Sequence, residues 1–230
     1  MSLSKLILAS SFVAASQAIT KDVKFGIFSD IHLYLNYNPD SSDNSCTFTN
    51  QTNQLVKNKV PKSEVKLDQK ALLGRLGCDT PQALIEYIIM LFNELTYDEF
   101  YTCDYIIING DLIAHGIAQE PEGVYQEDLY QLLKDTHTKV NEIFKEYFWE
   151  IPVFITLGNN DSKFLNNAPF KEDKEEFYKF MLELWFKNDF ANGRWYSDIQ
   201  DTFMDGGYYK IDINKKFTLL SLNTLYYNKD

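Results

Sequence analysis

Positive charge is scarce in this sequence. Its 230 residues include 22 lysines and arginines against 33 aspartates and glutamates, which gives a formal net charge of −11. This shortage argues against non-specific binding of nucleic acid, because such binding needs clustered basic side chains. An anionic substrate would need a local source of positive charge, most simply a bound cation. The alternative is that the acidity only keeps the protein soluble.

Long apolar runs are also absent from most of the chain. After the N-terminal segment no stretch reaches the roughly 18 apolar residues of a membrane-spanning helix, so we expect no transmembrane segment. Residues 1–18 have the pattern of a cleaved secretory signal, with Lys5 first, an apolar run at 6–15 and the small residues Ser16 and Ala18 at the positions that a signal peptidase reads. We therefore expect a mature chain from Ile19 that is secreted or lies in a lysosomal or vacuolar lumen. An uncleaved hydrophobic N-terminal helix is the alternative.

Cysteine is rare, with three residues in all. A secreted chain with three cysteines is expected to form one disulfide and to keep one thiol. Cys46 and Cys78 flank a polar insertion at 36–80 that a disulfide between them would tie down. Cys103 precedes an apolar strand and is expected to be a small buried thiol. Within the insertion, Asn50 begins an Asn-Gln-Thr glycosylation sequon.

Internal repeats and a Pro- or Ser-rich linker are absent as well, so we expect one domain. Short apolar runs predict strands, and apolar residues at three- and four-residue intervals predict helices. In chain order these are a strand at 23–29, a helix at 81–95, a strand at 105–109, a helix at 124–148, a strand at 152–157, a helix at 172–187, and strands at 208–213 and 217–223. Asp79, Thr80 and Pro81 are expected to start the first helix, with a capping side chain followed by proline in the first turn. The alternation predicts a parallel α/β sheet, which binds ligands at the carboxyl ends of its strands.

Potential metal ligands follow each of the first three predicted strands. Asp30 and His32 follow the first, Asp111 the second and Asn159 the third. Because Asp30 and His32 are two residues apart, an extended segment would point both side chains to the same side. A carboxylate and an imidazole placed in this way can bind one divalent cation. Each feature alone also occurs in ordinary turns, and it is their succession that predicts a metal site.

These motifs resemble the calcineurin-like metallophosphoesterases, whose pattern is Asp-x-His, then Gly-Asp, then Gly-Asn-His-Asp or Gly-Asn-His-Glu. The matching stretches are SDIHL at 29–33, NGDLIAHG at 109–116 and LGNND at 157–161. Within the family, the sequence looks most like the branch of acid sphingomyelinase, the acid-sphingomyelinase-like phosphodiesterases and endopolyphosphatase. The signal peptide, GCDTP at 77–81 and SLNTLYY at 221–227 carry this closer likeness.

The resemblance implies an αββα fold, in which helices flank a β-sandwich, and an activity that hydrolyses phosphate esters. By this likeness Asp30 and His32 hold one divalent cation, Asp111 bridges two cations, and Asn159 holds the second. Zinc is the expected metal for a secreted protein with histidine and aspartate ligands. The resemblance further implies that water between the cations attacks phosphorus in line, and that His115 acts as a donor or general acid.

The sequence departs from the family pattern at two points. Asn160 stands where many relatives have histidine; its amide can hydrogen-bond a phosphate oxygen but cannot give up a proton near neutral pH. An acid role would therefore fall to His115 or to water. The only histidines are His32, His115 and His137, so the family's three later histidine ligands are absent. His137 itself is expected at the surface of the long helix.

From these points we expect residues 19–230 to be the N-terminal portion of one metallophosphoesterase domain, with an incomplete second sheet. The first hypothesis is a phosphodiesterase similar to acid sphingomyelinase. Asn160 favours endopolyphosphatase as the alternative, so the substrate is a sphingomyelin-like lipid, a nucleotide or polyphosphate. A hypothesis of another class is a non-catalytic fragment or pseudoenzyme that serves as a binding module, because the missing histidines would weaken a two-metal site.

Overall fold

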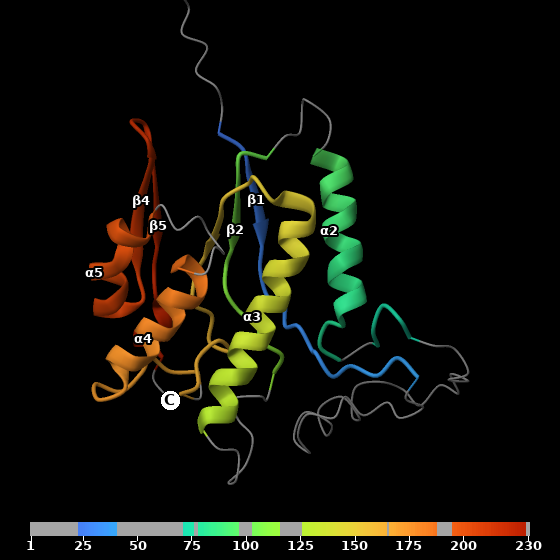
Figure 1. The fold of residues 1–230 in the computed structure, drawn as a ribbon, viewed down its shortest axis with the longest axis horizontal. Coiled ribbons are helices and arrows are strands. Elements are labelled where there is room, and N and C mark those ends of the chain that lie inside the picture. The colour runs from blue at the N-terminus through green and yellow to red at the C-terminus, as the bar shows by residue number, and fades with distance from the viewer. Residues whose placement is uncertain are drawn as a thin grey trace, which may run out of the picture.

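The computed structural model describes residues 23–40, 71–75, 78–96, 103–115, 126–164, 166–187 and 195–228. Within them, three strands alternate with helices, and two further helices and two further strands follow. Figure 1 shows two sheets near the middle of the molecule with helices on both outer sides. This layered arrangement brings the early strand ends to one edge of the larger sheet.

The larger sheet is parallel throughout. Its strands are β1 (Phe25–Phe28), β2 (Tyr105–Ile108) and β3 (Val153–Ile155), in the spatial order β1-β2-β3. Ile108 of β2 pairs with Phe28 of β1 and with Ile155 of β3. The strands are short runs rich in isoleucine and phenylalanine, residues that suit a buried pleated surface. Because the strands are parallel and in register, their carboxyl ends lie at one edge of the sheet.

Two helices cover one face of this sheet. They are α2 (Gln82–Thr96), which precedes β2, and α3 (Gln126–Phe148), which connects β2 to β3. The ring of Phe28 packs edge-on against Phe92 of α2 and Phe144 of α3, with ring centroids 5.0 Å apart in each pair. The apolar stripes from which these helices are predicted therefore form the contact with the sheet.

The smaller sheet packs against the opposite face. It consists of β4 (Tyr209–Asn214) and β5 (Phe217–Ser221), which are antiparallel. The Tyr209 hydroxyl donates a 2.7 Å hydrogen bond to the carbonyl of Ile155 in β3, and the ring of Phe217 lies 5.0 Å from that of Phe25. Helices α4 (Lys174–Leu182) and α5 (Tyr196–Gly206) lie on the outer side of this sheet (Figure 1). The expected αββα arrangement is confirmed.

Two elements near the end of the chain differ from the sequence-based expectation. The sequence analysis does not predict α5, which ends where Gly207 adopts a left-handed conformation with φ of 67°, as glycine does after many helices. The strand predicted at 217–223 ends at Ser221, and residues 224–227 of the SLNTLYY stretch form a 3₁₀ helix, η3 (Thr224–Tyr227), which the sequence analysis does not predict. The side chain of Asn223 accepts a hydrogen bond from the Leu225 amide and so starts this turn.

Several expectations concern residues outside the described part of the chain. Residues 1–18, Cys46 and Asn50 lie there, so the signal peptide, the disulfide with Cys78 and the glycosylation stay predictions. Cys103 is a free thiol, as the sequence analysis expects, but it is only partly buried. Among the helices that the structure describes, none combines the length and the apolar character needed to cross a bilayer.

Candidate metal centre

The ends of β1 and β2 bring three potential ligands together. One ligand atom each from Asp30, His32 and Asp111 lies within 4.8 Å of the others. Nε2 of His32 is 3.8 Å from Asp30 Oδ1. Two carboxylates and an imidazole at this spacing match the donor types that zinc and related divalent cations prefer. The strand tips therefore present a set of side chains that fits a metal ion.

The imidazole of His32 is fixed in the orientation that a metal ligand needs. Its Nδ1 lies 2.8 Å from the carbonyl oxygen of Ile113. A carbonyl oxygen only accepts, so Nδ1 donates and the neutral ring has its lone pair on Nε2. That nitrogen is the one that faces Asp30. A backbone carbonyl commonly fixes the tautomer of a metal-binding histidine in this way.

The backbone at these three residues is unusual. Asp30, His32 and Asp111 have φ angles of 54°, 44° and 55°, in the left-handed region. Residues other than glycine rarely adopt this conformation, and where they do, the strain often marks a functional site. The extended segment expected around Asp30 and His32 is therefore wrong, although their side chains do converge. Left-handed backbone angles at Asp30 and His32, with Ile31 between them, bring the two side chains together, and not the alternation of a strand.

Two glycines allow the tips of β2 and β3 to touch. A Cβ on Gly158 would overlap the backbone nitrogen and the carboxylate of Asp111. Gly110 has φ of 78°, and a Cβ on it would lie 2.5 Å from the nitrogen of Gly158. The lack of a side chain at both positions thus places the Asp111 carboxylate directly against the loop that contains Asn159 and Asn160.

Asn159 and Asn160 lie on either side of this contact. Asn159 lines the same pocket as Asp30 and Asp111, and its Nδ2 donates to Asn166 Oδ1 at 3.0 Å. Asn160 is buried, and both its backbone nitrogen, at 2.7 Å, and its side-chain Nδ2, at 3.3 Å, donate to Asp111 Oδ1. Asn160 thus contacts a predicted metal ligand, whereas Asn159 faces the pocket.

Asp161 is a site residue that the sequence analysis misses. It is fully buried, and its carboxylate accepts hydrogen bonds from the backbone nitrogens of Asp111, Leu112 and Gly158 at 2.8, 3.0 and 3.0 Å. Burial raises the pKa of Asp161 to about 7, against the lowering effect of these donors. The three donors favour the ionised form, because a proton on the carboxyl would find no acceptor among them, whereas burial opposes ionisation and is the larger effect. The acidic residue at the end of LGNND is the signal that could have indicated it.

His115 lies on the other side of the His32 ring. The two rings are stacked with centroids 3.9 Å apart. Asp79 accepts from the His115 backbone nitrogen and lies 2.7 Å from its Nδ1, and this carboxylate raises the pKa of His115. The side chain of His115 is 55% exposed. Asp79 therefore orients His115, a contact that the sequence analysis does not predict.

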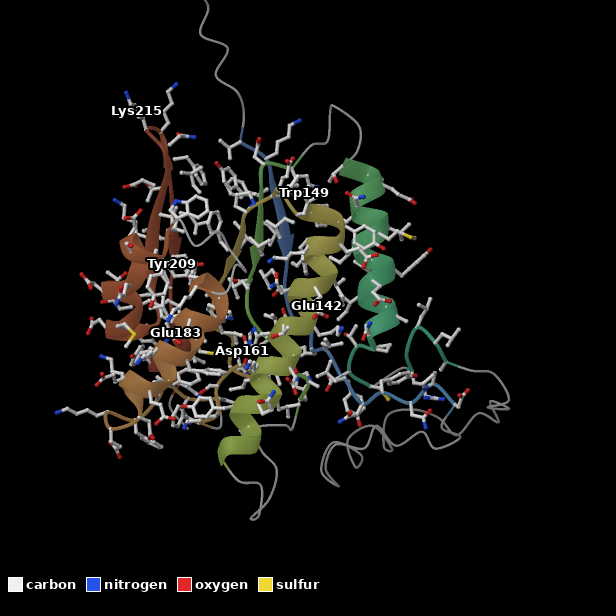
Figure 2. The ribbon with its side chains drawn as sticks, viewed as in Figure 1. Glu142, Trp149, Asp161, Glu183, Tyr209 and Lys215 are labelled. Carbon is white, nitrogen blue, oxygen red and sulfur yellow. The ribbon has the colours of Figure 1, made fainter. Side chains whose placement is uncertain are left out.

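His137 is not at the surface, so the expectation for this residue is wrong. Its side chain is fully buried on the inner face of α3. His137 Nε2 lies 3.7 Å from Asp161 Oδ1, and the indole nitrogen of Trp185 donates to His137 Nδ1 at 3.1 Å. Figure 2 labels Asp161 where the sheet meets α3. Polar contacts with two other buried side chains explain why this position faces inward.

A pocket of about 480 Å³ opens beside the strand tips. Asp30, Asp111 and Asn159 form one side of it, and Leu220 and Leu222 form part of another. Each of these leucines is 64% exposed. Among the described residues that line the pocket there is no lysine or arginine. The pocket thus combines acidic metal-ligand candidates with an apolar wall.

Comparison with known proteins decides the family. The sequence profile of the calcineurin-like phosphoesterases matches residues 23–230. The chain belongs to the calcineurin-like phosphoesterase family. Members of this family use divalent metals, in agreement with the ligand groups at the strand tips of this phosphoesterase. The family resemblance from the sequence motifs is therefore confirmed.

Individual relatives within the family are similar to this chain at modest sequence identity, and those described here are named as sphingomyelin or sphingomyelinase phosphodiesterases. The chain is 27% identical over 161 residues to sphingomyelin phosphodiesterase 2 of Caenorhabditis elegans, which covers 65% of this chain and 22% of that protein. It is 27% identical over 171 residues to sphingomyelinase phosphodiesterase C of Dictyostelium discoideum, covering 72% of this chain and 33% of the relative. Sphingomyelinase phosphodiesterase D of the same organism is 28% identical over 166 residues, with 71% and 32% covered. The chain thus spans a third or less of these relatives' lengths.

Proposed function

We propose that this phosphoesterase is a metal-dependent hydrolase of phosphodiesters related to sphingomyelin, the substrate that its relatives' names contain. The observation that carries the proposal is the convergence of Asp30, His32 and Asp111 within 4.8 Å. Their left-handed backbone supports it, because strain of this kind is retained mainly where the geometry has a use. The Nδ1–H of His32 and the buried Asp161 beneath the site add to this support.

The side chains divide the work between metal binding and proton transfer. Asp30 and His32 would hold one divalent cation, Asn159 would hold a second, and the Asp111 carboxylate would be shared by both, with zinc as the proposed metal. When bound, such cations supply an activated water and stabilise charged phosphate oxygens. His115, oriented by Asp79, donates a proton to the leaving group. Asn160 holds the Asp111 carboxylate and hydrogen-bonds a phosphate oxygen.

The pocket favours a phosphodiester with an apolar or uncharged group over polyphosphate. Leu220 and Leu222 offer apolar contact next to Asp30, which suits an organic ester group. A chain of phosphates would need several cationic partners to offset its charge, and the described lining residues include none. We therefore place endopolyphosphatase second.

We also propose that the protein acts outside the cytoplasm. The signal at 1–18, a disulfide between Cys46 and Cys78 and glycosylation at Asn50 belong to this proposal. Expression in a secretory host, followed by mass spectrometry of the product, tests it. The expected product begins at Ile19, has a glycan on Asn50 and shows the Cys46–Cys78 peptide without reduction.

The activity is tested with the purified chain and three substrates. Metal content is measured by elemental analysis after incubation with Zn²⁺ or Mn²⁺. Hydrolysis is then followed on bis-p-nitrophenyl phosphate, on sphingomyelin by choline release, and on polyphosphate by chain shortening. We expect two bound metals per chain and release of nitrophenol and choline.

Each outcome separates the hypotheses. Shortening of polyphosphate without choline release would favour endopolyphosphatase. Two tightly bound metals without turnover of any substrate would favour a binding module that retains the metal site. A chain that folds but binds no metal would contradict the proposed metal centre itself. Asp111→Asn serves as the inactive control and Asp198→Asn, at an exposed position of α5, as the control with normal metal binding.

A further inference from the structure

A chain of buried polar contacts runs from the metal centre to the helices behind it. Asp161, which holds the backbone of Asp111, lies 3.7 Å from Nε2 of His137. His137 in turn accepts a hydrogen bond from Trp185 in the π-helical turn η1 (Glu183–Lys187). The side chains of Asp161, His137 and Trp185 are all fully buried. The contacts therefore connect η1 through α3 to the tip of β2.

The hydrogen bond from Trp185 decides where the proton of His137 lies. An indole N–H only donates, so His137 Nδ1 accepts and has no proton. Burial lowers the pKa of His137 to about 3, which keeps the ring neutral. The single proton of such a ring is on Nε2, the nitrogen that faces Asp161. Nε2 has no hydrogen-bond partner at normal distance among the described residues. The acceptor that its N–H faces is the Asp161 carboxylate, 3.7 Å away.

We propose that His137 is a positioning residue for the metal centre. Its Nε2–H, fixed by Trp185, faces Asp161 Oδ1 at 3.7 Å, which is longer than a hydrogen bond. Its electrostatic attraction supplements the three backbone N–H groups that hold the carboxylate against the backbone of Asp111. The role of His137 in metal binding rests on the proposed metal centre. The tautomer of the His137 ring and its connection through Asp161 to the Asp111 amide rest only on the described contacts.

A purely structural histidine would behave differently. If the ring only fills space, an apolar residue of similar volume would leave the hydrogen bonds of Asp161 intact. If the Nε2–H matters, loss of the donor leaves a buried carboxylate with one partner fewer, whereas a residue with an N–H in the same place restores it. His137→Leu and His137→Gln make this comparison, because glutamine places an amide N–H near the position of Nε2.

The first measurement concerns the metal-free protein. Ring ¹⁵N chemical shifts of selectively labelled histidine are expected to show His137 as the neutral tautomer with its proton on Nε2. Amide hydrogen exchange at Asp111 and Leu112 is expected to rise at least about tenfold in His137→Leu and to stay near the parent rate in His137→Gln. Ile143→Ala is the matched control, because Ile143 is a buried residue of the same helix and its side chain has no N–H or O–H to donate.

The second measurement adds the metal. Zn²⁺ affinity is expected to fall roughly 10–100-fold in His137→Leu, the range for lost partners of metal ligands, and to change little in Ile143→Ala. A ring proton on Nδ1, or equal exchange in the Leu and Gln variants, would overturn the inference. If the parent chain binds no Zn²⁺, the proposed metal centre fails while the exchange data still decide the role of His137.

Should His137→Leu not fold, Trp185→Phe, which removes the donor to Nδ1, is expected to raise exchange at Asp111 instead.

Discussion

The backbone amide of Asp111 donates a 2.8 Å hydrogen bond to the buried carboxylate of Asp161. One strand tip therefore holds the next, because Asp161 follows β3 and Asp111 follows β2. Asp111 Oδ1 in turn accepts from the backbone of Asn160. The two loops thus exchange hydrogen bonds in both directions, and the predicted metal ligand after β2, Asp111, is positioned by Asn160 and Asp161, which are not predicted metal ligands.

Replacement of Asp161 by asparagine is expected to disrupt this exchange. The amide group of asparagine would place N–H donors against the backbone N–H groups of Asp111, Leu112 or Gly158, so at least one buried donor would lose its acceptor. Each such loss costs about 1–3 kcal/mol. We expect the free energy of unfolding in urea to fall by at least about 2 kcal/mol. Asp212→Asn, at an exposed site of β4, is the control, and an equal loss there would contradict the assignment.

Gly158→Ala tests the close approach of the strand tips. The new methyl group would overlap the backbone and carboxylate of Asp111, and the rigid backbone cannot move aside without loss of the site. We expect a destabilisation of at least about 1–3 kcal/mol, as for other overpacked positions, together with weaker Zn²⁺ binding. The control is Gly26→Ala, whose methyl group would meet the side-chain ring of Phe92 instead. Loss of Zn²⁺ affinity in both variants alike would argue against a local effect.

Asp111→Asn tests the bridging role. The neutral amide removes a negative charge between two cations, so we expect Zn²⁺ binding by calorimetry to weaken by at least an order of magnitude and any phosphodiesterase activity to disappear. The hydrogen bond from the Asp111 backbone to Asp161 does not involve the altered group, so the fold is expected to persist. Unchanged affinity in a folded Asp111→Asn variant would refute the bridging role.

The contact between Asp79 and His115 predicts a pH dependence. The hydrogen bond that the His115 ring donates to the Asp79 carboxylate raises the folded-state pKa of His115 above the ordinary value. The stabilisation from this contact is therefore fully present below the unfolded pKa of about 6.5 and is lost as the pH rises through the higher folded value. In metal-free protein, NMR titration of Asp79→Asn is expected to show a lower pKa of His115 than in the parent. An unchanged pKa would show that Asp79 does not control the ring.

The early strands and their ends are the part of the fold that could be predicted from the sequence. Val153–Ile155 and Tyr105–Ile108 are apolar runs long enough only for short buried strands, and the parallel pairing follows from the helices between them. The element α5 could not be predicted in the same way, because its apolar residues are few and its position depends on contact with α4 and β4. The local sequence pattern predicts an element well where its residues form a continuous buried run. It predicts an element poorly where contacts with distant segments determine whether the element forms.

The candidate site likewise contains residues that the sequence predicted and residues that it did not. The residue types after each strand indicated Asp30, His32, Asp111 and Asn159 without any coordinates. The partners of these residues gave no such signal, since Asp79 resembled a helix cap and His137 a surface histidine. Their roles depend on neighbours 36 and 24 positions away, at His115 and Asp161.

By itself, the sequence determined the family, the order of the strands and the ligand types at their ends. These features follow from periodicity and from motifs in which all residues are close along the chain. Only the tertiary structure decided that Asp30, His32 and Asp111 adopt left-handed backbone angles, that Asp161 and His137 are buried behind them, and that Asp79 orients His115. Burial and hydrogen-bond partners are set by the packing of distant segments, and no local pattern contains that information.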